Sequence, residues 1–228
     1  MNKLMITDIA GQFAIYGEFI SASSFGNGHI NDTFQSSWNQ AGTAVRYTHQ
    51  RINQRVFIHP DKVMENILRV TSHIAKKNRE AGVSDWSRRS LTVVPAKDGN
   101  PWVRDGDGSW WRTYLFIENS HTQDTTDSFS KARFLGAGIG LFQKQLADLP
   151  SPRLHDTIEG FHDMEKRYLR FHEAFEKDAF GRKKNAKAEI DFLLENEKRG
   201  APCEGRIYIN ENWAITNRAF RTNITGKA

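Results

Sequence analysis

Alternating apolar and polar positions dominate the first hundred residues and predict β-strands. Strand patterns cover residues 13–16 and 18–21, on either side of Gly17. A return strand is expected over residues 30–37, and a third strand over residues 45–52. The front of the chain is therefore predicted to form a small antiparallel sheet.

A helical pattern interrupts the strands after Pro60, with Asp61 as the expected N-cap. Strand patterns return over residues 91–95, 102–104 and 110–117, where three tryptophans are expected to pack in the core and in turns. The apolar positions that share one face of the predicted helix are Val63, Ile67, Val70 and Ile74.

The pattern changes to helices after residue 118, with amphipathic stretches over residues 129–146 and 188–197 and another around Tyr168. We therefore predict an α+β fold with three parts: residues 1–117, a strand-rich lobe; residues 118–197, a hinge and the first helices of a second lobe; and residues 198–228, a tail. In the stretch over residues 129–146, the apolar positions that share one helical face are Leu135, Ile139, Phe142 and Leu146.

The composition is that of a soluble globular protein, with 38% hydrophobic and 26% charged residues in 228. No apolar run approaches the roughly 20 residues that span a bilayer, and the N-terminus lacks a signal pattern. Cys203 is the only cysteine. These features predict a cytoplasmic protein that does not associate with membranes.

The net charge of +5 does not by itself indicate nucleic-acid binding. Lysines and arginines are scattered among acidic residues rather than gathered in one segment. We therefore expect no nucleic-acid partner.

Residues 24–34, with the sequence SFGNGHINDTF, place paired glycines between two predicted strands. Glycines allow a tight turn and close approach of a ligand, and successive N–H groups in such a turn bind phosphates. Protein kinases cover their nucleotide with a glycine-rich turn of this kind. In a bilobal kinase layout, the hinge residues Phe116, Ile117 and Glu118 would face the adenine.

Residues 25–34 resemble the nucleotide loop of the N-acetylhexosamine 1-kinases, members of the aminoglycoside phosphotransferase and choline kinase-like superfamily. Similar stretches follow in the family's order over about residues 7–197: Arg46-Tyr47 with Gln50 and Asn53, then residues 63–67 (VMENI), 110–118 (WWRTYLFIE), 161–163 (FHD) and 189–192 (EIDF).

The resemblance implies a protein-kinase-like fold and magnesium-dependent transfer of the ATP γ-phosphate to the anomeric hydroxyl of an N-acetylhexosamine. Gln50 takes the place of a lysine found in many kinases, and Glu65 is a candidate partner for it. The expected nucleotide-binding residues are Gly26, Asn27, Gly28, His29, Ile30, Asn31, Thr33, Gln50, Phe116, Ile117 and Glu118.

Phosphoryl transfer needs an aspartate at the acceptor hydroxyl and a second carboxylate for magnesium. The family supplies them from a His-Asn-Asp or His-Gly-Asp loop and an Ile-Asp-Leu-Asp strand, and neither motif occurs in this chain. No catalytic or magnesium-binding residue is therefore assigned. The remaining His-Asp combinations, His59-Pro60-Asp61, His155-Asp156 and His162-Asp163, are expected to cap and pack helices.

The resemblance is lost over residues 198–228, which leads to the hypothesis that a frameshift or premature stop in a longer parent gene left an inactive or impaired fragment. Resequencing of the locus tests this hypothesis. Two alternatives stay open: a non-catalytic nucleotide-binding or regulatory module, and a small binding protein in which the glycines only form a hairpin. Uncovered Leu135, Ile139 and Phe192 would favour self-association.

Overall fold

The computed structural model describes residues 3–26, 30–120, 125–161 and 163–200, which form an α+β fold with an antiparallel sheet, as the sequence predicts. The chain divides into two compact units between Thr157 and Ile158. The predicted tail at 198–228 lies outside the described residues, except that the last helix extends to Gly200.

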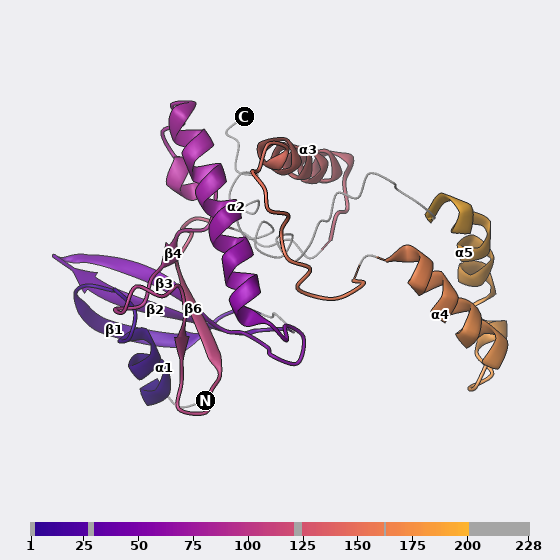
Figure 1. Cartoon of the computed structure of the whole chain (residues 1–228), viewed down its shortest axis with the longest axis horizontal. Coiled ribbons are helices and arrows are strands. Elements are labelled where there is room, and N and C mark those ends of the chain that lie inside the picture. The colour runs from indigo at the N-terminus through magenta and orange to yellow at the C-terminus, as the bar shows by residue number, and fades with distance from the viewer. Residues whose placement is uncertain (1–2, 27–29, 121–124, 162, 201–228) are drawn as a thin grey trace. The chain divides into compact units, whose positions relative to one another are not determined.

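The sheet has the strand order β1-β2-β3-β6-β4, and β5 also pairs with β6 (Figure 1). All pairings are antiparallel, and the predicted return strand and third strand are confirmed. The strand expected at residues 91–95 is shorter than predicted. The strands are β1 (Glu18–Ser24), β2 (Asp32–Gln40), β3 (Thr43–Arg51), β4 (Val93–Val94), β5 (Val103–Arg104) and β6 (Trp110–Leu115).

Helix α1 (Lys3–Ala10), which the sequence analysis did not anticipate, packs on one face of the sheet beside β1 (Figure 1). Residues 13–16 do not form the predicted strand, because in this stretch only Phe13 bridges to Ala96. Gly17 ends the stretch at φ 92°, and a Cβ there would lie 2.1 Å from the Asn39 carbonyl oxygen. The core on this face contains Ile6, Ile9, Ala10, Phe13, Phe34, Trp38, Tyr47, Val94, Val103 and Trp111.

Helix α2 (Pro60–Glu80) follows β3 and buries the predicted apolar face. Its N-cap is His59 and not Asp61, and the His59 side chain makes no capping bond. Pro60 takes the first helical position, where its missing N–H costs nothing. Asp61 lies in the first turn, where its negative charge complements the helix dipole. A short 3₁₀ helix, η1 (Trp86–Arg88), follows.

Helix α3 (Phe129–Leu146) packs against α2 through Phe142, which joins Val70 and Ile74 in a small core. The Ser128 side chain caps α3 by accepting a hydrogen bond from the Lys131 N–H. The other end is tied to α2 by polar contacts. Lys77 Nζ lies 2.6 Å and His73 Nε2 3.1 Å from Asp148 Oδ1, and these bonds lower the pKa of Asp148 to about 2.

The second unit contains α4 (Met164–Lys177), the 3₁₀ helix η2 (Lys183–Asn185) and α5 (Lys187–Gly200). Tyr168 of α4 is buried, and its hydroxyl donates to the Leu193 carbonyl of α5 at 3.3 Å. His172 Nε2 lies 2.9 Å from Glu197 Oε1. The Asp163 side chain caps α4 by accepting from the Lys166 N–H, which confirms the capping role predicted for it.

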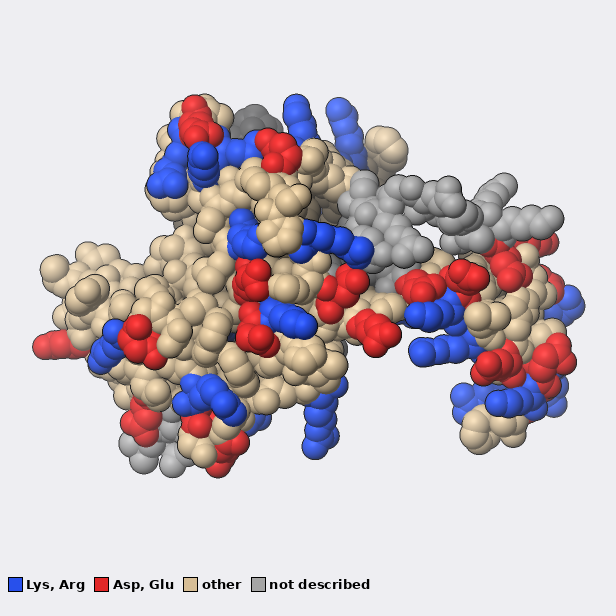
Figure 2. All heavy atoms as spheres, viewed as in Figure 1, with Lys and Arg blue, Asp and Glu red and all other residues tan. Residues whose placement is uncertain are grey.

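Basic and acidic side chains are interspersed on the face of the molecule that Figure 2 shows. Several form pairs one helical turn apart, as in Lys76–Glu80 and Lys187–Asp191. Within the described ranges, no helix is both long and apolar enough to cross a membrane.

The side chain of His49 is buried in the core of the sheet-containing unit. His49 on β3 is fully buried, with Nε2 2.7 Å from Ser36 Oγ and Nδ1 2.8 Å from Thr113 Oγ1. Burial penalises the charged ring and lowers the pKa of His49 to about 4. The folded protein therefore holds His49 neutral over a pH range in which the unfolded chain protonates it.

This buried histidine predicts a loss of stability in acid. From pH 7 to 4.5 the unfolded state takes up a proton that the folded state excludes until about pH 4, so His49 removes about 2 kcal/mol of unfolding free energy. Urea unfolding at the two pH values measures this loss. His49→Gln should reduce the pH dependence by that amount, whereas exposed His59→Gln should keep it. Equal pH dependence in wild type and His49→Gln would contradict the assignment.

Candidate functional site

The glycine turn connects β1 with β2, at the edge of the sheet formed by β1. Gly26 has φ 78°, a left-handed conformation that favours glycine. The Phe25 N–H donates to the Thr33 carbonyl at 2.8 Å and closes the base of the turn. Three of the predicted site residues, Asn27, Gly28 and His29, lie outside the described residues.

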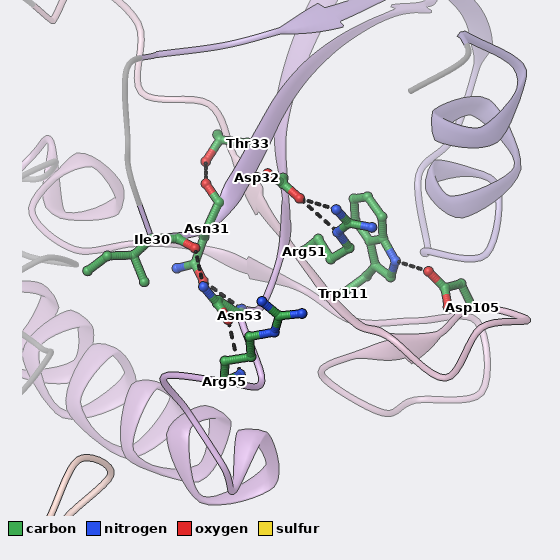
Figure 3. Close-up of polar contacts among 9 residues, drawn as sticks. All are labelled: Ile30, Asn31, Asp32, Thr33, Arg51, Asn53, Arg55, Asp105 and Trp111. Atoms are coloured by element: carbon green, nitrogen blue, oxygen red, sulfur yellow. Dashed lines mark hydrogen bonds and ion pairs between the residues drawn. The ribbon is translucent and has the colours of Figure 1, made fainter.

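Asn53, just after β3, holds the returning arm of the turn (Figure 3). Its backbone N–H donates to Asn31 Oδ1 at 2.9 Å, and its Nδ2 donates to the Ile30 carbonyl at 3.0 Å. Its own Oδ1 accepts from the Arg55 N–H at 3.0 Å. The asparagine therefore fixes predicted site residues Ile30 and Asn31, on the returning arm, to the end of β3.

Figure 3 shows two further contacts, one between β3 and β2 and one between β6 and the turn that follows β5. Arg51 of β3 pairs with Asp32 at the start of β2, with its Nε 2.8 Å from Asp32 Oδ2. Trp111 Nε1 donates to Asp105 Oδ2 at 2.8 Å, and the Asp105 side chain also organises the turn between β5 and β6. The core role predicted for this tryptophan is confirmed, because Trp111 is completely buried.

Thr33, Gln50 and Arg112 form a row across the sheet, since Thr33 pairs with Gln50 and Gln50 with Arg112 in the strand register. Directly opposed residues point to the same side of a sheet. We call this side the polar face, which also carries Thr48 and Tyr114. It is opposite the face on which α1 packs, so predicted site residues Thr33 and Gln50 lie away from the apolar core.

Hydrogen bonds connect the row. Gln50 Nε2 donates to Thr33 Oγ1 at 3.0 Å, and Gln50 Oε1 accepts from Arg112 Nε at 3.2 Å and from Arg112 Nη2 at 3.1 Å. Arg112 is only 5% exposed, and its Nη1 is buried without a hydrogen-bond partner. Among the described residues, the ion pairs do not include this guanidinium. Within the described ranges, the polar face therefore contains a buried cation that lies 5.5 Å from the centroid of the Tyr114 ring but has no partner anion.

The predicted hinge residues lie next to the turn. The Phe116 ring packs edge-on against the Phe25 ring, with the centroids 5.3 Å apart, and the Arg46 guanidinium lies 4.2 Å from the Phe116 centroid. Arg46 Nε donates to Glu118 Oε1 at 2.8 Å, and this bond raises the pKa of Arg46. The structure thus brings Phe116 and Glu118 together with the base of the glycine turn, through Phe25 and Arg46.

Several backbone groups of the hinge already have partners. The Phe116 N–H donates to the Arg46 carbonyl at 2.9 Å, which extends the pairing of β3 with β6. The Ile117 carbonyl accepts from Ser120 Oγ at 3.1 Å, and the Glu118 carbonyl accepts from Arg88 Nη2 at 2.7 Å. The Phe116 N–H and the carbonyl groups of Ile117 and Glu118 are therefore already used in bonds within the protein.

Glu65 does not partner Gln50. Its Oε2 lies 2.8 Å from His155 Nε2, while the Asn66 side chain bonds to the His155 backbone at both its N–H and its carbonyl, each at 2.9 Å. The packing role expected for His155 is confirmed, because these bonds attach it to α2. His162 lies outside the described residues.

The described residues contain no group of three or more histidine, cysteine, aspartate or glutamate side chains that could hold a metal ion. The carboxylates near the glycine turn and the hinge, Asp32 and Glu118, each pair with an arginine. This donor set does not fit a magnesium site. No protein-family model matches the chain.

Arg112 and Arg46 take part in the contacts of the candidate site, although the sequence predicts no role for them. Both occur in stretches that carry the resemblance, which was the only signal available. Their partners lie 62 and 72 positions away in the chain, at Gln50 and Glu118. Local patterns do not report contacts at such separations.

We expect Asn53→Ala to loosen the glycine turn, because it removes the bond from Nδ2 to the Ile30 carbonyl and the bond accepted from the Arg55 N–H. The cost should be about 1–2 kcal/mol of unfolding free energy. Amide hydrogen exchange should accelerate at residues 30–33. Arg55→Ala is the matched control, because Arg55 contributes its backbone N–H to this network. Unchanged exchange in Asn53→Ala would contradict this role of Asn53.

Proposed function

We propose that this chain binds an adenine nucleotide on the polar face, as the first lobe of a protein-kinase-like phosphotransferase that resembles the N-acetylhexosamine 1-kinases. The adenine would lie at residues 116–118 and the phosphates beside the glycine turn. The proposed site residues are those that the sequence indicates: the turn from Gly26 to Thr33, Gln50, and the hinge.

The main support is the contact between the turn and the hinge. Phe25, before the glycines, packs against Phe116, which begins the hinge, with the ring centroids 5.3 Å apart. Thr33, after the glycines, bonds to Gln50 on the neighbouring strand. Residues far apart in sequence, predicted separately as phosphate-binding and adenine-binding, are thus connected through these two contacts. A simple hairpin turn would not require these contacts.

The buried guanidinium of Arg112 gives a chemical reason to expect an anionic ligand. A cation buried without a partner charge is costly unless an anion completes the site. A nucleotide phosphate on the polar face would supply such an anion. The buried charge supports a nucleotide phosphate as the ligand, whereas the described residues contain no cluster of three or more histidine, cysteine, aspartate or glutamate side chains that could hold magnesium.

We propose further that these 228 residues bind ATP without transferring its phosphate to a sugar. The motifs that would supply an acceptor-side aspartate and a magnesium carboxylate do not occur in the sequence. This corresponds to a non-catalytic nucleotide-binding module, or to an impaired member of the family. The proposal places the protein in the cytoplasm, with a sugar as the ancestral substrate class.

We propose that the chain self-associates through exposed apolar side chains of helices α3 and α5. Phe129, Phe134 and Leu141 on α3 are exposed, as is Phe192 on α5. Apolar side chains uncovered in this number favour contact with other copies of the chain.

Calorimetry with the full chain tests the nucleotide proposal. We expect a dissociation constant for ATP of about 0.2 mM, equivalent to ~5 kcal/mol, because one lobe provides only part of a kinase site. Phosphorylation of N-acetylglucosamine and N-acetylgalactosamine, with magnesium present, should not be detected. Failure to bind ATP at about 10 mM would refute the nucleotide site, and turnover at roughly 1–100 per second would refute the non-catalytic part.

A pair of variants locates the binding. Phe116→Ala removes the ring that joins the hinge to Phe25, and should weaken ATP binding about tenfold if Phe116 both frames and contacts the adenine. Phe129→Ala is the matched control, since Phe129 is 86% exposed on α3. Circular dichroism melting should show that both variants stay folded. Equal affinities for the two variants would place the nucleotide elsewhere.

A further inference from the structure

The Arg112 guanidinium is a buried cation whose donors are only partly used. Nε and Nη2 both bond to the single oxygen of the Gln50 side chain, while Nη1 is buried without a partner. Arginine side chains at such depth are ordinarily paired with an acid. Among the described residues, Arg112 has a neutral amide in that place. The side chain thus has a positive charge without a paired acid among the described residues, and one buried donor group without a hydrogen-bond partner.

The contacts of Arg112 also fix which way the Gln50 amide points. An arginine side chain only donates hydrogen bonds, so the group that faces it must be Gln50 Oε1. Nε2 then points toward the glycine turn, where it donates to Thr33 Oγ1 at 3.0 Å. Thr33 Oγ1 in turn lies 3.4 Å from the Asn31 carbonyl and donates to it. The hydrogen bonds of the row therefore run from Arg112 toward the turn.

The amide group carries two hydrogens, and the row uses one of them. Gln50 is half-buried, and within the described ranges its amide nitrogen donates to Thr33 only. Both the field of the guanidinium and the second N–H favour a negatively charged oxygen beside Gln50. Reversal of the amide would instead present an oxygen acceptor, which repels phosphate. Arg112 prevents that reversal.

We propose that Arg112 is a positioning residue that selects nucleoside diphosphates and triphosphates over the uncharged nucleoside. It holds Gln50 with its N–H groups toward the phosphates and supplies the positive charge that Gln50, at the place of a kinase lysine, lacks. This proposal rests on the proposed function, because it requires the polar face to bind an adenine nucleotide.

The decisive measurement compares ATP with adenosine on the full chain. Gln50→Glu keeps the size of the side chain, pairs with Arg112 and removes both the free N–H and the uncompensated charge. We expect it to raise the dissociation constant for ATP at least tenfold while changing that for adenosine less than twofold. Thermal stability should be unchanged or higher, because the buried cation gains a partner. Arg112→Met should shift the ATP-to-adenosine ratio in the same direction.

Arg104→Met is the matched control for charge, since Arg104 lies exposed on β5 and its loss should leave both dissociation constants unchanged. If wild type binds ATP but the ratio is the same in Gln50→Glu, the role of Arg112 is wrong while the nucleotide site stands. If wild type prefers adenosine or binds both equally, the phosphate selection is likewise wrong. If wild type binds neither ligand, the proposed function itself fails, and this inference fails with it.

Discussion

Strand β6 is buried on both faces and pairs with β3, β4 and β5, and its register with β3 determines both the core and the candidate site. Trp111 enters the apolar core, while the adjacent Arg112 points to the polar face. A slip of one residue would exchange them and bury a guanidinium in the apolar core, which makes the register strongly specified. Burial of the tryptophan thus places the arginine beside Gln50.

The elements with strong local patterns were the ones that the sequence could predict. Helix α2 shows its apolar face at regular spacing, and the strands of the meander alternate between apolar and polar residues. Helix α1 was missed because eight residues make a helix that is marginal alone and is stabilised by packing on the sheet. The same dependence on packing explains why the strand predicted at residues 13–16 does not form. In this stretch only Phe13 bridges to the sheet, at Ala96.

The sequence predicted several residues of the candidate site, but it did not predict the buried charge beside them. The glycine turn, Gln50 and the hinge could be named from local sequence and resemblance. The turn-to-hinge contact, the role of Asn53 and the burial of Arg112 arise from strands that meet only after folding. The burial of an arginine in a strand cannot be predicted from one sequence, because arginine side chains are ordinarily exposed. Its partner becomes evident only from the strand register.

The central claim is that the polar face binds the nucleotide. Chemical-shift mapping of isotope-labelled protein during ATP titration tests it most directly, because it reports the location of binding and not only its strength. The account predicts the largest shifts at the Gln50 side-chain amide, at Thr33 and at the backbone amides of residues 117–118. Shifts confined to α1 and the apolar core, or to α4 and α5, would contradict it.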